Sequence, residues 1–146
     1  MTTNGSCLCG TVKFEIADKG FAAAFNCYCT NCRKASGAQL TTFFQVRAAA
    51  FKWTAGTDSI GSYDSSPGNP RAFCKTCGAR VPWQGKLPTM IVPGGALDGD
   101  PGIRPYAVFY ERSKAKWCTA DDDAQVFAEL PPQTFWGDFM MRILGR

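Results

Sequence analysis

The chain has 146 residues, of which 45% are apolar and 19% charged, so an ordinary folded domain is expected and a disordered chain is excluded. Sixteen basic and twelve acidic residues give a net charge of +4, and no basic run exceeds two residues, which argues against nucleic-acid binding. The first residues, MTTNGSCLCG, do not resemble a secretion signal, and no apolar run approaches the roughly 18 residues of a membrane span, so we expect a cytoplasmic protein without membrane contact.

Short apolar stretches separated by turn residues predict a mainly β fold. Val12, Phe14 and Ile16 alternate with polar residues, which is typical of a half-buried strand, and residues 21–25 are a candidate hairpin partner for it. Further strands are predicted at residues 40–46, 51–53, 71–74, 90–92 and 106–110, with a loop at residues 64–70.

One helix is predicted, at the C-terminus. Phe135, Phe139 and Ile143 recur every four residues, and two prolines precede them. We expect a domain over residues 1–131 and a helical tail over residues 132–146 that packs on the domain's own core. A contact with a second copy, in a homodimer, is the alternative.

Eight cysteines and no histidine are the most informative feature of the composition. Seven cysteines fall in three clusters: Cys7-Leu8-Cys9, Cys27-Tyr28-Cys29-Thr30-Asn31-Cys32 and Cys74-Lys75-Thr76-Cys77. A disulfide scaffold would suit a secreted protein, whereas clustered thiols in a reducing cytosol are more often metal ligands. Without imidazole, a metal site must use thiolates, and Cys118, which stands alone, is expected to be a small buried residue.

The spacing of the clusters predicts two kinds of site. The first and third clusters each supply two thiols followed by a glycine, Gly10 or Gly78, and glycine accepts the backbone curl that a metal turn needs. Together they can make a closed four-thiolate site, whereas the middle cluster supplies three thiolates and leaves a position open.

The spacing does not fix which clusters pair. The competing arrangement joins Cys7, Cys9, Cys27 and Cys29 in one set and Cys32, Cys74 and Cys77 in the other. Zinc is favoured over a rubredoxin-like iron site, because such a site usually uses two C-x-x-C turns and one half here is C-x-C.

Charged residues near the middle cluster are candidate binding groups. Arg33 and Lys34 follow Cys32 directly and are predicted to hold an anionic substrate, although they could also be two solvated cations. Asp98 lies in a glycine-rich turn and is a candidate acid or base, but such aspartates are more often structural.

These clusters resemble the glutathione-dependent formaldehyde-activating enzyme family, which also includes centromere protein V. The matching segments are residues 5–12 (GSCLCGTV), 27–38 (CYCTNCRKASGA), 73–78 (FCKTCG), 94–98 (GGALD), 115–117 and 127–131. Tyr28 stands at a position that is often histidine in the family, and residues 80–82 (RVP) replace its commoner proline-leucine ending.

The resemblance implies a β-tent fold of short twisted sheets around two zinc sites. It implies that Cys7, Cys9, Cys74 and Cys77 hold structural Zn²⁺ and that Cys27, Cys29 and Cys32 hold a second, catalytic Zn²⁺. The activity it implies is that of a carbon–sulfur lyase acting on small thiol adducts, by default the formation of S-hydroxymethylglutathione from glutathione and formaldehyde. A non-enzymatic interaction module and a thiol-based metal or redox sensor are the alternatives.

Overall fold

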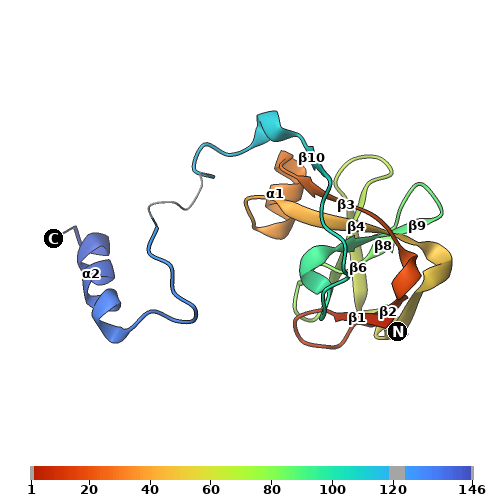
Figure 1. Ribbon diagram of the computed structural model, residues 1–146, viewed down its shortest axis with the longest axis horizontal. Coiled ribbons are helices and arrows are strands. Elements are labelled where there is room, and N and C mark those ends of the chain that lie inside the picture. The colour runs from red at the N-terminus through yellow and green to blue at the C-terminus, as the bar shows by residue number, and fades with distance from the viewer. Residues whose placement is uncertain (1, 119–123, 146) are drawn as a thin grey trace.

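The computed structural model describes residues 2–118 and 124–145, and it confirms a mainly β fold with a C-terminal helix (Figure 1). The strands of the described chain are β1 (Thr2–Ser6), β2 (Lys13–Ala17), β3 (Phe21–Cys27), β4 (Thr41–Arg47), β5 (Phe51–Ala55), β6 (Ile60–Asp64), β7 (Pro70–Cys74), β8 (Trp83–Gln84), β9 (Thr89–Pro93) and β10 (Ala107–Phe109). Its α-helices are α1 (Thr30–Ser36) and α2 (Gln133–Ile143).

The strands form three short sheets. One has the order β1-β2-β5, the second β10-β3-β4-β9-β8, and the third is the hairpin β6-β7. Neighbouring strands are antiparallel except for β10, which pairs with β3 in parallel. The cysteine clusters lie where these sheets end, at the ends of β1, β3 and β7.

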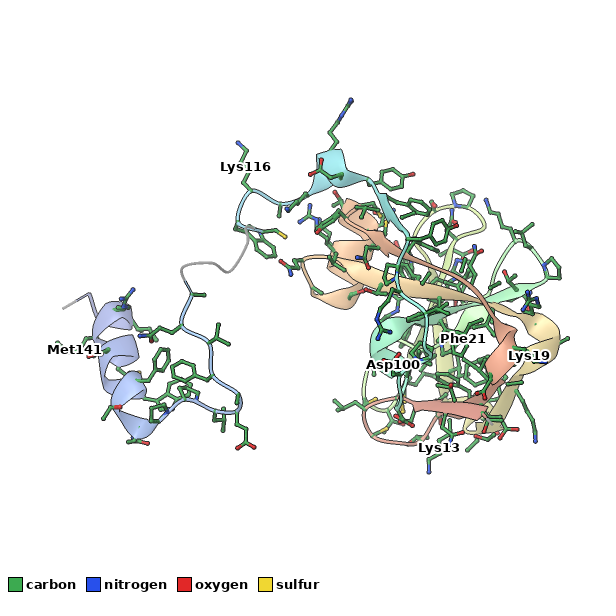
Figure 2. All side chains as sticks on the ribbon, viewed as in Figure 1. Lys13, Lys19, Phe21, Asp100, Lys116 and Met141 are labelled. Atoms are coloured by element: carbon green, nitrogen blue, oxygen red, sulfur yellow. The ribbon has the colours of Figure 1, made fainter. Side chains whose placement is uncertain are left out.

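The core lies between the three-stranded and the five-stranded sheets. Phe14 and Ile16 of β2 are 1% and 0% exposed, as their alternation with polar residues predicts, and they pack with Phe44 and Val46 of β4. The side chain of Lys13, the residue before Phe14, points out of this body (Figure 2). This packed core gives the cysteine turns at its edge a rigid support.

The predicted hairpin between residues 12–16 and 21–25 is wrong. Residues 21–25 lie in β3, but β3 pairs with β4 and β10, while β2 pairs with β1 and β5. A 3-10 turn at Asp18–Gly20 carries the chain from one sheet into the other. Gly20 packs so closely there that a Cβ atom would lie 2.5 Å from Cβ of Ala50.

The other predicted strands are present, and the loop predicted at residues 64–70 is shorter, residues 65–69, because Asp64 ends β6 and Pro70 begins β7. Three strands were not predicted, β1, β6 and β8, and neither was α1. β1 is a polar edge strand and β8 has two residues, so neither carries a hydrophobic period. The seven residues of α1 include Cys32 and two cations, and so they show no apolar stripe.

The predicted C-terminal helix is present as α2. Trp136 and Met140 of α2 are 38% and 48% exposed, and Leu144, directly after the helix, is 59% exposed, while the side chain of Phe139 lies outside the described residues. Within the described residues, neither helix combines the length and the apolar character that a membrane crossing requires. The packing of α2 on the domain stays a prediction.

Candidate metal centres and the adjoining cavity

The first and third cysteine clusters come together in one four-cysteine set. Cys7 and Cys9 follow β1, Cys74 ends β7, and Cys77 lies in the next turn. Their four sulfurs lie within 4.8 Å of one another, with 3.6 Å between Cys7 and Cys9 and 3.9 Å between Cys9 and Cys74. Zinc–sulfur bonds of about 2.3 Å in a tetrahedron place sulfurs about 3.8 Å apart, so this set fits a zinc ion.

The two turns of this set curl through a glycine each, as the sequence predicts. Gly10 and Gly78 adopt φ values of 74° and 75°, in the left-handed region that favours glycine. The curl aims backbone N–H groups at sulfur: Val12 donates to Cys7 Sγ over 3.3 Å, and hydrogen bonding from the N–H of Cys77 lowers the pKa of Cys74. Such bonds stabilise thiolates without a charged side chain.

The middle cluster forms a separate three-cysteine set. Cys27 ends β3, Cys29 caps the N-terminus of α1, and Cys32 lies in the first turn of that helix. Their sulfurs lie within 4.8 Å of one another, and the Cys32 N–H donates to Cys29 Sγ over 3.3 Å. The cysteines are therefore grouped as four and three, and the alternative pairing of the clusters is not the one that the structure has.

The three thiols of this set have different electrostatic environments. Burial raises the pKa of Cys27, and it raises the pKa of Cys32 to about 12. Burial also acts to raise the pKa of Cys29, but hydrogen bonds from the Cys32 N–H and from neighbouring thiols outweigh it, so this pKa is lowered. A bound cation, or a positively charged side chain, is what would stabilise all three as thiolates together.

A cavity of about 480 Å³ opens beside the three-cysteine set. This volume is within the usual range of small-molecule sites. The cavity reaches the three cysteines, and its walls include four aromatic and two cationic side chains: Phe25, Phe43, Trp83, Tyr110, Arg71 and Lys86. The ring of Phe43 packs edge-on against Trp83, with 5.5 Å between centroids, so this wall is firmly held.

Tyr110 has an unusual backbone on the rim of this cavity. Its φ of 56° is left-handed, which is uncommon for a residue other than glycine. It follows β10, where Phe109 stacks on Phe25 with 4.5 Å between ring centroids, and the Phe109 carbonyl accepts a hydrogen bond from the Tyr28 N–H. β10 thus fastens the rim to the chain around Cys27 and Cys29.

The two cations predicted from the sequence lie on α1. Arg33 Nε donates to the Tyr28 carbonyl over 3.2 Å, and Lys34 is exposed. Neither is among the residues that line the cavity. Their role in holding an anion stays a prediction. The arginine that lines the cavity is Arg71.

Two other residues singled out from the sequence lie elsewhere. Asp98 accepts a hydrogen bond from Ser6 over 3.4 Å and lines a second cavity, of about 560 Å³, beside Cys7. Cys118 is buried, as predicted, and its thiol donates to Gln39 over 2.8 Å. Neither residue lines the cavity of the three-cysteine set.

Arg71 is the site residue that sequence reasoning missed. Its Nη1 donates to Cys32 Sγ over 3.5 Å, and its Nε donates to Ser65 Oγ over 2.9 Å. Strand alternation was a usable signal: Ala72 and Cys74 share one buried face of β7, so Arg71 must point to the opposite side. Which cysteines lie on that side could not be read from the sequence.

Comparison with known proteins agrees with these sites. Residues 2–113 match the family described as glutathione-dependent formaldehyde-activating enzyme. A crystal structure of a Rhodobacter sphaeroides protein from a structural genomics programme is similar with a TM-score of 0.52 and 26% identity, over 72% of this chain and 98% of that one. Because the family match includes both cysteine sets, the chain belongs to the glutathione-dependent formaldehyde-activating enzyme family.

Proposed function

We propose that the protein is a zinc-dependent carbon–sulfur lyase acting on small thiol adducts, with S-hydroxymethylglutathione as the default product. The observation that carries this proposal is the 480 Å³ cavity that ends on Cys27, Cys29 and Cys32. Four thiolates close a zinc site, whereas three leave a position for a small molecule. The four-cysteine set is accordingly structural and the three-cysteine set catalytic.

A zinc ion held by the three cysteines would supply two kinds of chemistry, lowering the pKa of a thiol and polarising a small carbonyl group. In the synthetic direction the thiol sulfur bonds to the carbonyl carbon while the carbonyl oxygen takes a proton, and the lyase direction reverses both changes. Confining thiol and carbonyl in one cavity supplies the proximity that the reaction needs.

The residues of the cavity support this reaction in distinct ways. Phe43 and Trp83 exclude water from one wall, and Arg71 and Lys86 supply positive charge for an anionic thiol such as glutathione. Among the described lining residues, Lys86 and Tyr110 can donate a proton besides the thiols, and none is a carboxylate. A cytoplasmic location suits the proposal, because the cysteines must stay reduced.

Exchange measurements at equilibrium test the proposal. Thiols add to formaldehyde without a catalyst, so the assay must measure the exchange rate between free glutathione and its hydroxymethyl adduct above background, by magnetisation-transfer NMR. We expect acceleration by the zinc-loaded chain and its loss in Cys29→Ala. Cys118→Ala is the matched control, since this buried cysteine belongs to neither set.

The same measurement separates the alternatives. Absence of acceleration by a wild-type chain that holds two zinc ions would contradict the lyase and favour the interaction module. Release of the second zinc on mild oxidation, again without acceleration, would favour the sensor.

A further inference from the structure

A guanidinium group is built into the three-cysteine set. Arg71 reaches it from β7, on a different part of the chain from the cysteines, with 3.5 Å between Nη1 and Cys32 Sγ. Ser65 fixes the other side of this guanidinium through its hydroxyl oxygen, 2.9 Å from Nε. Arg71 therefore reaches Cys32 in a defined geometry and also lines the cavity.

A second arginine, Arg80, lies close enough to Arg71 for the two charges to interact. Arg80 donates from Nε to the Ala72 carbonyl over 3.0 Å, and its guanidinium lies 5.2 Å from the centre of the Trp83 ring. Its Nη2 is buried and has no hydrogen-bond partner among the described residues. Burial and, to a smaller extent, the charge of Arg71 lower the pKa of Arg80 to about 10, while the charge of Cys32 acts in the opposite direction.

Two positive charges in a partly buried region repel each other, and a nearby anion offsets the energy of this repulsion. The three-cysteine set supplies that anion only when its sulfurs are thiolates, as they are around a metal ion. A zinc ion with three thiolates carries a net charge of about −1, and an anionic substrate makes the site more negative. Cations at this position would therefore favour both the metal-bound state and the binding of an anion.

We propose that Arg71, fixed by Ser65 and backed by Arg80, is the positioning residue that stabilises the thiolates of the three-cysteine set and makes the cavity select thiols that carry a negative group. The second half of this inference rests on the proposed function, whereas the first concerns the cysteines alone. It assigns to Arg71 the role that the sequence suggested for Arg33 and Lys34. Arg33 is engaged with the Tyr28 carbonyl outside the cavity.

The affinity of the three-cysteine set for a metal ion tests, without any substrate, whether Arg71 stabilises the thiolates. The full chain is loaded with one equivalent of zinc, and Co²⁺ is then titrated against a chelator while thiolate-to-cobalt absorption is followed. We expect Arg71→Gln to weaken Co²⁺ binding about 10- to 100-fold, because this is the effect of losing a hydrogen bond to a charged group. Arg71→Lys keeps the positive charge and should weaken the binding less. Arg104→Gln, which removes an exposed arginine that lines neither cavity, should bind as wild type does.

Equal affinity in Arg71→Gln and Arg104→Gln would overturn the proposal, and so would a loss in Arg33→Gln that exceeds the loss in Arg71→Gln. If Arg71→Gln does not fold, Ser65→Ala decides, because it releases Arg71 Nε and leaves the charge in place. We expect several-fold weaker Co²⁺ binding in Ser65→Ala, and unchanged binding would overturn the proposal.

Calorimetry with two thiols tests the selection of anions. Glutathione carries carboxylates and 2-mercaptoethanol carries none, so Arg71→Gln should lose about tenfold or more in affinity for glutathione and clearly less for 2-mercaptoethanol. An equal loss for both thiols would overturn the selectivity. If the wild-type chain binds neither thiol, the proposed function and the selectivity fail together, while the Co²⁺ result still decides whether Arg71 stabilises the thiolates.

Discussion

Removing one ligand from each cysteine set should have different consequences for stability and for metal content. Cys74→Ala removes one sulfur of the four-cysteine set. Cys74 is 0% exposed, and through this set the end of β7 meets the turn after β1. Cys29→Ala cuts into the three-cysteine set, where the side chain is half-buried beside the open cavity. We expect the first variant to unfold or melt far below wild type, and the second to fold and lose one zinc ion.

The magnitudes follow from the coupling of metal binding to folding. Structural zinc contributes an apparent free energy of about 10–16 kcal/mol in small zinc-finger peptides, and a whole domain is typically stable by about 5–15 kcal/mol. Losing a third of this zinc contribution, about 4 kcal/mol, would bring a domain at the lower end of that range close to unfolding. Cys29→Ala removes a partly exposed thiol and should cost about 1 kcal/mol.

Thermal melts and zinc content per chain, measured on the same samples, check this expectation. Cys118→Ala is the control, because it removes a buried thiol, 7% exposed, that belongs to neither set. It should cost about 1–2 kcal/mol and keep both metal ions. A Cys74→Ala protein that melts as Cys118→Ala does would contradict the structural role of the four-cysteine set. A Cys29→Ala protein that melts below Cys74→Ala would show that the roles of the two sets are reversed.

Two further predictions concern the scaffold. Gly56 has a φ of 74°, and a Cβ atom there would lie 2.1 Å from the Thr11 carbonyl oxygen, so Gly56→Ala should destabilise the domain by about 2 kcal/mol or more in chemical denaturation, whereas Gly95→Ala, where a Cβ meets no atom within 4 Å, should cost much less. Removing residues 132–146 should lower the melting temperature by roughly 3–8 °C and leave zinc content unchanged if α2 packs on the domain as predicted; an unchanged melting temperature with conversion of a dimer to a monomer would assign α2 to the contact between copies.

The sequence was most informative where one residue type performs one physical task. Alternation placed Phe14 and Ile16 in a buried strand, and cysteine spacing with the following Gly10 and Gly78 indicated the metal turns. These features are local, because each depends on residues only a few positions apart.

What could not be predicted depends on long-range pairing. The parallel pairing of β10 with β3, which fastens Tyr110 at the cavity rim, joins residues about eighty positions apart. Arg71 likewise lies 39 positions from Cys32, and only the folded chain brings their side chains within 3.5 Å of each other. Sequence proximity favoured Arg33, but the helix turns that side chain toward the Tyr28 carbonyl.

The two cysteine sets differ less in their sulfurs than in what balances the charge of those sulfurs. Around the four-cysteine set the stabilising groups are backbone N–H bonds, to Cys7 and Cys74, and Thr11. Hydrogen bonding with the Thr11 hydroxyl, 3.1 Å from Cys9 Sγ, and with the Thr11 N–H lowers the pKa of Cys9 to about 6. Backbone dipoles are fixed by the fold, so this set suits a permanent structural ion. The three-cysteine set also accepts a backbone N–H bond, from Cys32 to Cys29, but in addition Arg71 donates to Cys32 Sγ directly and lines the same cavity. A side-chain cation there can interact both with a thiolate and with an incoming anion, and for this reason we propose that binding and chemistry belong to that set and the support of folding to the other.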